Sequence, residues 1–271
     1  MLCINVCMRL QAALLSAALA GPAAAATDHA CLMEPRQILK LAAPVTGVVN
    51  SVTVDRGDRV KKGQLVATLD YEVEEAAALI AQVRAANDSA VRSGRARLDF
   101  LKRKQARNEQ LRTTDAVSFA QMDEATADAR VAEATLREAE LNMAMARLEA
   151  RRAEGQLQQR RILSPIDGVV TERLLGPGEF RNDQAHVLTI AELDPLRIET
   201  FLPIALFGQV KVGDHAEVSP EAPIGGSYTA VVTVVDQVLD AASSTIGVRL
   251  ELPNPEFRLP AGIRCRVRFE H

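Results

Sequence analysis

Aromatic residues are scarce in this sequence: its 271 residues include no Trp, 2 Tyr and 7 Phe. Aromatic side chains supply much of the buried area of compact cores and much of the lining of small-molecule pockets. Their scarcity argues against a large-cored enzyme with a substrate cleft. It favours a long, largely helical protein.

The sequence also lacks an excess of basic charge, with 32 Lys and Arg against 35 Asp and Glu and a net charge of −3. Proteins that neutralise nucleic-acid phosphates need a basic excess or a concentrated basic patch, so no nucleic-acid partner is expected. Beyond the N-terminal stretch there is no apolar run of about 18 residues, the length typical of a membrane-spanning helix. We therefore expect an elongated soluble protein.

The N-terminal stretch has the pattern of a secretory signal peptide, assigned to residues 1–26. Met8-Arg9 supplies a short positive region, an apolar core follows over residues 10–20, and Ala24-Ala25-Ala26 supplies a small-residue cleavage site. The alternative is an apolar helix of the fold, but Pro22 and the alanines that follow it suit processing better. We expect export to the periplasm.

Two cysteines, Cys31 and Cys265, remain after the predicted leader. An even number of cysteines in an oxidising compartment permits a disulfide between them, and two unpaired buried thiols are the alternative that the sequence leaves open. The four histidines are scattered and give no metal-ligand spacing with these cysteines, so no metal site is expected.

A segment near the N-terminus is repeated 121 residues further along the chain: LAAPVTGVV at 41–49 corresponds to ILSPIDGVV at 162–170. The register persists, because Gly57, Val66 and Leu69 correspond to Gly178, Val187 and Ile190. Alternating apolar residues bounded by Pro and Gly indicate short β-strands. Since so few small strands cannot bury a sheet face alone, residues 41–70 and 162–194 are expected to form one quasi-symmetric β-domain.

Residues 71–161, between the two halves, contain no Pro and are rich in strong helix formers. They predict an antiparallel coiled-coil hairpin of two helices of about 40 residues, each about 60 Å long. The turn is expected at 113–118, with Ser118 capping the second helix. Gly94 is expected opposite Leu136, a small residue facing a large one. The charged Lys102-Arg103-Lys104 is interpreted as a solvated face.

Two stripes are expected to form the contact between these helices. The second helix carries a heptad seam in which seven of eleven residues are Ala: Met122, Ala125, Ala129, Ala132, Leu136, Ala139, Met143, Ala146, Ala150, Ala153 and Leu157. The first helix carries a looser stripe: Val73, Ala76, Ile80, Val83, Asn87, Ala90, Gly94, Leu101 and Leu111.

Residues 195–271 alternate like the strands of a small β-barrel. Strands are expected from Leu196 onwards and over 214–219, 229–236, 245–252 and 264–270, with a short helix over 203–211; residues 27–40 form an N-terminal segment. The fold class is therefore α+β and elongated: a split lipoyl- or biotinyl-like β-domain, interrupted by an α-hairpin and followed by a small β-barrel.

This organisation, over about residues 39–269, resembles the HlyD-like periplasmic adaptor, or membrane fusion, proteins of tripartite efflux pumps and type I secretion systems. Their β-domain is similar to lipoyl and biotinyl carriers, which place a modified Lys in the turn between the halves. Here that turn begins Leu69-Asp70-Tyr71-Glu72-Val73 and holds the helical hairpin without a Lys. No cofactor is therefore expected.

The resemblance extends to the hairpin tip. The family's channel-docking motif is an Arg, a Leu four residues later and a Ser seven residues after that, which Arg107, Leu111 and Ser118 match. Arg can donate a forked set of hydrogen bonds, Leu can fill a groove between helices, and Ser can cap and bond outward. The alternative is a heptad Leu and a helix cap with no partner.

The barrel region matches the family at Asp240, over 245–249 and at Asn254-Pro255-Glu256, but has Ser243-Ser244-Thr245 where the family often has Thr-Arg-Thr. Many relatives continue into a membrane-proximal domain that rests on the transporter. The sequence ends at His271 as the barrel closes, which is interpreted as a short form without that domain.

The resemblance implies a non-catalytic adaptor, associated with the inner membrane through its partners. These would be a TolC-like outer-membrane channel, an inner-membrane transporter of the resistance-nodulation-division (RND) or ATP-driven (ABC) type, and further copies in a hexameric ring. No nucleophile–His pairing or Gly-rich phosphate loop supports an enzyme. The alternative function is a periplasmic regulatory or binding module that modulates a full-length adaptor or transporter.

Overall fold

The computed structural model describes residues 28–113 and 116–269, which divide into two units. One unit comprises residues 36–194, and the other comprises the residues up to Pro35 together with those from Pro195 onwards. Strands β1 (His29–Leu41) and β8 (Leu188–Pro203) contribute residues to both. The predicted signal peptide, residues 1–26, lies outside the described residues.

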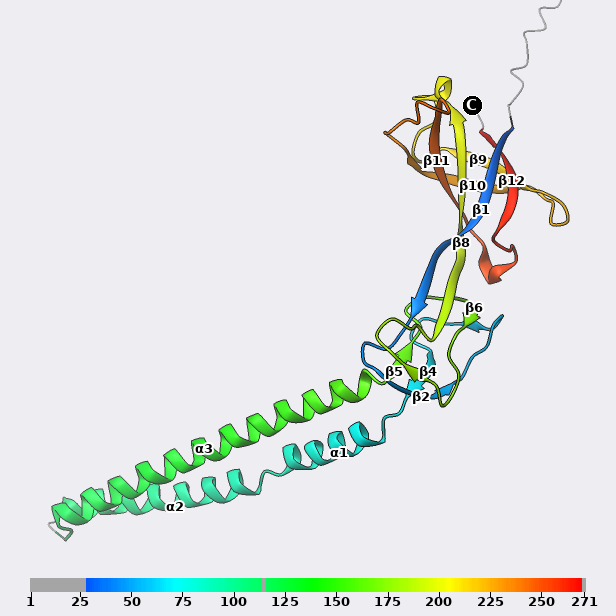
Figure 1. Ribbon diagram of the computed structural model, residues 1–271. Coiled ribbons are helices and arrows are strands. Elements are labelled where there is room, and N and C mark those ends of the chain that lie inside the picture. The colour runs from blue at the N-terminus through cyan, green and yellow to red at the C-terminus, as the bar shows by residue number, and fades with distance from the viewer. Residues whose placement is uncertain (1–27, 114–115, 270–271) are drawn as a thin grey trace, which may run out of the picture. The chain divides into compact units, whose positions relative to one another are not determined.

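Within residues 36–194, strands of one repeat copy pair with strands of the other (Figure 1). The first copy supplies β2 (Gly47–Val52), β3 (Arg59–Val60) and β4 (Leu65–Leu69). The second supplies β5 (Arg161–Leu163), β6 (Gly168–Arg173), β7 (Phe180–Arg181) and the start of β8. Strands β2, β3 and β4 pair antiparallel with β7, β6 and β5. The prediction of one β-domain built from both halves is confirmed.

The strand pairing follows the 121-residue offset of the repeat. Gly47 lies opposite Arg181 in the β2–β7 ladder, and Gly168 lies opposite Val60 in the β3–β6 ladder. Moving each member of the first pair by one repeat length gives the second pair, with the two copies exchanged. Gly57 and Gly178 occupy equivalent turns with φ of 94° and 87°, a backbone region that glycine enters without steric cost.

The core of this β-domain consists of aliphatic side chains from both copies. Val66, Leu69, Val187 and Ile190 are completely buried in it. At Gly168, a Cβ would lie 2.5 Å from the carbonyl oxygen of Ala191 on β8, so this position must be glycine. Because this core is built from both copies, each half buries its apolar side chains against the other.

The turn between β4 and β5 holds three helices, α1 (Glu72–Ala86), α2 (Ser89–Arg112) and α3 (Phe119–Gln158). Helix α3 runs antiparallel to α1 and α2, as Figure 1 shows. The first predicted helix is thus broken in two: Asn87 has an extended backbone, with φ −79° and ψ 100°. Its side-chain Oδ1 accepts a hydrogen bond from the backbone N–H of Ser89 at 3.1 Å, a local bond that competes with helix continuation.

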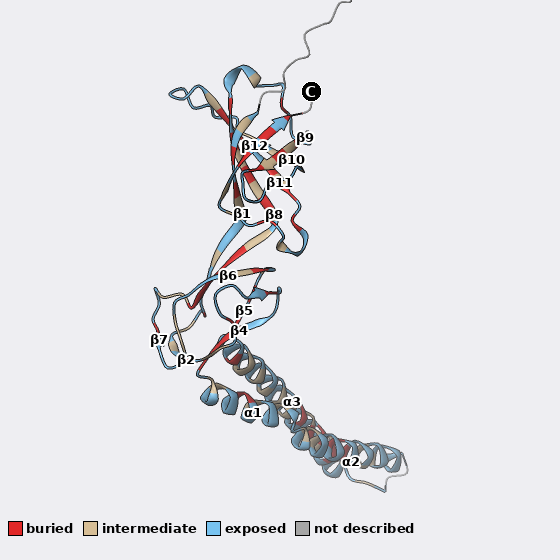
Figure 2. Ribbon diagram, turned by 90° about the vertical axis from the view of Figure 1, so that its right-hand side faces the viewer, coloured by how far each residue is buried: buried red, intermediate tan, exposed pale blue. Residues whose placement is uncertain are grey.

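Residues 29–35 and 196–269 form a closed β-barrel. Its strand order is β1, β12 (Ile263–Phe269), β9 (His215–Pro220), β10 (Tyr228–Val235), β11 (Thr245–Leu252) and β8, which pairs back to β1. Two short 3₁₀ turns, Ile204–Leu206 and Pro255–Phe257, stand in its connections. The first replaces the longer helix expected over 203–211, because the backbone leaves helical geometry at Phe207, with ψ 127°, and Gly208 follows with φ 83°. Figure 2 shows buried residues alternating along the barrel strands.

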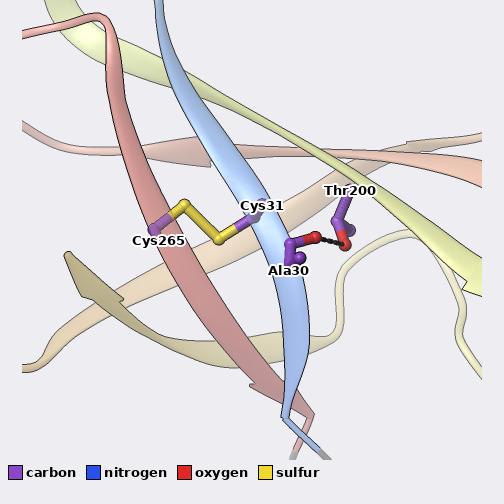
Figure 3. Close-up of a disulfide and its surroundings, with 4 residues drawn as sticks. All are labelled: Ala30, Cys31, Thr200 and Cys265. Atoms are coloured by element: carbon purple, nitrogen blue, oxygen red, sulfur yellow. Dashed lines mark hydrogen bonds between the residues drawn. A yellow bond between two sulfur atoms is a disulfide. The ribbon is translucent and has the colours of Figure 1, made fainter. Parts of the chain in front are cut away.

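Strand β1 closes the barrel between β12 and β8. Cys31 lies opposite Cys265 in the β1–β12 ladder, and a disulfide joins their sulfur atoms (Figure 3). Their Cα atoms are 4.8 Å apart, close to the spacing of about 4.5 Å in a non-hydrogen-bonded antiparallel pair. On the other side, the Thr200 hydroxyl donates to the carbonyl oxygen of Ala30 at 2.8 Å. The N-terminal segment, residues 27–40, therefore contains a barrel strand that its sequence pattern does not predict.

Candidate functional site: the helical hairpin and its tip

Helix α3 packs on α1 and α2 through a seam of small residues. Every predicted seam position is buried or half-buried, and Ala125, Ala129 and Ala132 are almost completely inaccessible. A Cβ at Gly94 of α2 would lie 3.4 Å from Leu136 Cδ1 and 3.5 Å from Leu136 Cα. The predicted seam and the predicted pairing of Gly94 with Leu136 are confirmed.

The stripe expected on the first helix is correct at Gly94 and Leu101 of α2 and wrong at its other positions. On α2, Gly94 is half-buried and Leu101 is buried. The four α1 positions, Asn87 in the break and Ala90 at the start of α2 are all exposed; the α1 positions are Val73, Ala76, Ile80 and Val83. Leu111, at the tip, is also exposed.

Helix α1 turns a different face toward α3. Ala78 is buried, and Glu74, Ala81 and Ala85 are half-buried. The break at Asn87 changes the helical phase, so a heptad counted through it does not stay on one face. The larger apolar residues of α1 consequently point away from α3, and small ones make the contact.

Polar contacts set the register of the hairpin. Arg95 pairs with Glu140 at 3.1 Å, and Lys104 pairs with Asp128 at 3.3 Å; both pairs are largely exposed and contribute little stability. At the base, the Arg160 guanidinium pairs with Glu74 and donates to the carbonyl oxygen of Thr46 at 3.1 Å. Arg160 therefore ties α1, α3 and the β-domain together.

The tip is shaped by the end of α2 and the cap of α3. The Ser118 Oγ accepts a hydrogen bond from the Gln121 backbone N–H at 3.3 Å, and the Ser118 N–H donates to Gln121 Oε1 at 3.1 Å. This reciprocal arrangement is a capping box, and the predicted cap is confirmed. The Asn108 amide donates to the Gln121 carbonyl at 3.5 Å, which joins the two helices beside the turn.

Arg107, Leu111 and Ser118 are all exposed at this end of the hairpin, with Leu111 at 41% exposure. Arg107 and Leu111 are four residues apart on α2 and so share one face. Ser118 begins α3 across the turn, of which residues 114–115 lie outside the described residues. The structure places the three residues at one end of the hairpin; their docking role stays a prediction.

Sequence reasoning missed an aromatic side chain at the tip. Phe119 directly follows the cap, is 76% exposed and lies under the Arg112 guanidinium, 5.9 Å from ring centroid to Cζ. That distance is within the range of a cation–π contact. The signal available in the sequence was a Phe directly after the predicted cap, in a chain with only 7 Phe.

Titratable side chains were compared for clusters that could bind a metal ion. Within residues 28–113 and 116–269, no group of three or more His, Cys, Asp or Glu could hold a metal ion. The pKa of Asp240 is lowered because the Ser243 hydroxyl and the N–H groups of Ala242 and Ser243 donate to its carboxylate. Asp240 thus stabilises the connection between β10 and β11.

None of the helices in the described part of the chain has the length and apolarity needed to cross a membrane.

Comparison with known proteins matches both β-regions. Residues 37–192 match the family described as CzcB-like, barrel-sandwich hybrid domain, and residues 198–271 match the CusB-like, beta-barrel domain. The macrolide export protein MacA of Escherichia coli O157:H7 is 26% identical over 242 residues, which are 85% of this chain and 64% of MacA. An uncharacterised protein of Haemophilus influenzae is 24% identical over 241 residues, 88% of this chain and 56% of that protein.

The matched part of the chain thus spans between 56% and 64% of the length of these curated relatives. Among solved structures, MacA from Actinobacillus actinomycetemcomitans superimposes with a TM-score of 0.71 and 22% identity, covering 90% of this chain and 78% of MacA. That likeness concerns the fold, and the family match covers more than half of the chain. The chain belongs to the membrane fusion, or periplasmic adaptor, family, as a member with a CzcB-like barrel-sandwich hybrid domain and a CusB-like β-barrel.

Proposed function

We propose that this chain is a non-catalytic periplasmic adaptor of a tripartite efflux or type I secretion system. It bridges an inner-membrane transporter, of the RND or ABC type, to a TolC-like outer-membrane channel. The observation that carries the proposal is the hairpin in the turn of the β-domain, with Arg107, Leu111 and Ser118 exposed at its end. In this proposal the protein acts mechanically, by holding the transporter and the channel in one assembly.

The tip residues have separate roles in the proposed docking. Arg107 forms no ion pair within residues 28–113 and 116–269, so its guanidinium can donate to backbone carbonyls of a channel helix. The Leu111 side chain enters a groove between two channel helices. Ser118 holds the turn through its cap, so its contribution to docking is partly the shape of the turn.

The other parts of the chain support this bridge. The β-domain and the barrel of neighbouring copies assemble into a hexameric ring around the export path, and the barrel side faces the transporter. The chain is exported through its N-terminal signal and associates with the inner membrane through these partners. The exported substrate passes through the ring without a chemical step at this chain.

In-cell cross-linking at the tip tests the proposal. Arg107→Cys and Ser118→Cys are expected to capture a TolC-like outer-membrane channel, identified by mass spectrometry, and Leu111→Asp is expected to abolish the capture. Arg97→Cys is the matched control, since Arg97 is exposed on the same helix several turns below the tip. It should capture no channel.

A substitution at Ser118 can separate its role as the N-cap of α3 from its proposed role in docking. Asp is as good an N-cap as Ser, so Ser118→Asp retains the turn while adding a charge at the tip, and loss of capture there reports on docking. Absence of capture from folded, exported Arg107→Cys and Ser118→Cys chains contradicts the adaptor role. It would favour a regulatory module that acts on a full-length adaptor or transporter.

A further inference from the structure

One end of the β-barrel carries exposed apolar side chains on two of its connections. Strands β8 and β10 end there and β9 and β11 begin there, because neighbouring strands run antiparallel. The β8–β9 connection carries Ile204 and Phe207, which are 46% and 48% exposed. The β10–β11 connection carries Val238 and Leu239, which are 87% and 37% exposed. These four residues are called the apolar rim.

Backbone hydrogen bonds hold the two connections side by side. The Ile204 N–H donates to the carbonyl oxygen of Ser244 at 3.1 Å, and Asp240 and Thr245 exchange backbone hydrogen bonds of 3.1 and 3.3 Å. Thr245 also lies opposite Pro203, at the end of the β8–β11 ladder. The rim residues follow directly on both sides of this row, so they belong to one surface.

The rim offers apolar contact and no charge of one sign. Residues 204–209 and 237–239 contain no charged side chain. The charges that border these segments are Lys211, Asp236 and Asp240, and the Asp240 carboxylate already accepts hydrogen bonds from the Ser243 hydroxyl and the Ala242 N–H. A partner of this surface must therefore be apolar where it touches the rim, and it need not be anionic.

The N-terminal strand begins at the same end of the barrel. Figure 1 shows the start of β1 beside the end of β12 and at the same end as the end of β8. The predicted leader comprises residues 1–26 and β1 begins at His29, so only Thr27 and Asp28 separate them. The apolar core of a leader engages the membrane across which the chain is exported. The rim therefore belongs to the end of the barrel that is tethered closest to the inner membrane during export.

We propose that the apolar rim inserts into the lipid interface of the inner membrane and holds the exported chain directly on the bilayer. A fluid interface accepts separate apolar side chains on loops without a matching groove, and their removal from water supplies the binding energy. The contact rests on the proposed function only for export to the periplasm. It adds to association through partner proteins and does not depend on the hairpin tip.

Vesicle flotation tests this contact with the chain purified from the periplasm, after intact mass has verified that residues 1–26 are absent. The wild type is expected to float with vesicles of phosphatidylcholine alone, and added salt should not release it, because the contact is apolar. Phe207→Asp and Val238→Asp should each weaken binding about tenfold or more. Ile224→Asp is the matched control, since Ile224 is also exposed but lies between β9 and β10 at the opposite end of the barrel.

Tryptophan substitutions locate the inserted residues, because the chain contains no other Trp. Phe207→Trp and Val238→Trp are expected to shift their emission to shorter wavelength with vesicles, and brominated phosphatidylcholine should quench them. Ile224→Trp should show neither effect. Unchanged circular dichroism would verify that every variant is folded.

Three results would overturn the proposal. The first is a wild type that does not float with phosphatidylcholine vesicles. The second is binding that requires added phosphatidylglycerol and is lost in salt, which would indicate an electrostatic contact. The third is equal loss of binding, or equal quenching, at Ile224 and at the rim.

The hairpin tip separates this inference from the proposed function. Leu111→Asp should abolish channel capture and leave vesicle binding unchanged, because Leu111 lies on α2 and outside the barrel. Vesicle binding without channel capture by Arg107→Cys contradicts the adaptor role alone. Channel capture by a chain that does not bind vesicles contradicts the lipid contact alone.

Discussion

The β-barrel and the helical hairpin bury different kinds of side chain. The barrel core contains large aliphatic residues with no exposed surface, such as Leu196, Ile198 and Leu250. The hairpin instead buries Ala and Leu in equal number, four of each, and many of its larger apolar residues are exposed; pale blue, exposed positions cover much of its helices in Figure 2. The barrel is stabilised by a core of large side chains that it encloses, whereas the hairpin is held by a narrow seam in which Ala and Gly lie against a few Leu residues.

Truncating one large core residue should have the largest effect and should distinguish the two regions. Leu250→Ala is expected to destabilise the barrel by about 2–5 kcal/mol, because it leaves a cavity in a closed core. Denaturant unfolding would measure this. Phe201→Ala is the control, since Phe201 lies on the neighbouring strand β8 but is 68% exposed. If Phe201→Ala costs as much as Leu250→Ala, the barrel is not stabilised by its interior.

Removing the disulfide should have the next largest effect, confined to the barrel. The double variant Cys31→Ser/Cys265→Ser is expected to lower barrel stability by about 2–4 kcal/mol, since the bond closes a long loop in the unfolded chain. Its ends are 234 residues apart. Unfolding of the oxidised wild type and the variant gives the difference, with hairpin helicity as the internal control. Free thiols in the native wild type would contradict the pairing.

Two glycines of the hairpin give the smallest and most local test. Gly94→Leu is expected to destabilise the hairpin by about 1–3 kcal/mol, because the new side chain meets Leu136 in a close-packed seam. Gly155→Leu meets nothing within 4 Å of its Cβ and should stabilise α3 by up to about 1 kcal/mol, since Leu favours helices. Thermal melting followed at a helical wavelength measures both. Equal effects would mean that the seam does not limit side-chain size.

The sequence was sufficient where a pattern continued without interruption. The 121-residue repeat predicted the paired halves of the β-domain, and the Ala heptad predicted the face of α3 that meets the other helices. The prediction of one continuous first helix was wrong, because Asn87 and Asp88 interrupt it. No Pro or Gly marks the break in the sequence. Only the structure shows that the break rotates the face of α1 and leaves Ile80 and Val83 exposed.

The barrel shows a second limit of local patterns. Cys31 and Met33 are buried and Leu32 is exposed, an alternation too short to identify β1 as a strand on its own. Its partners β12 and β8 lie far along the chain. The hairpin tip shows the opposite case. The cap at Ser118 could be predicted from the sequence because it depends only on Gln121, three residues later.

The position of β1 also dictates the order in which the chain folds. Cys265 stands 234 residues after Cys31, so in a chain exported with its N-terminus first, Cys31 reaches the oxidising compartment well before Cys265. During that time β1 has neither β12 nor β8 beside it, and unpaired strand edges invite pairing with other chains. Residues 36–194 contain all the strands of their own β-domain and can fold in the meantime. The chain therefore matures from its middle outward, and the segment made early must be kept from aggregating until the late strands arrive.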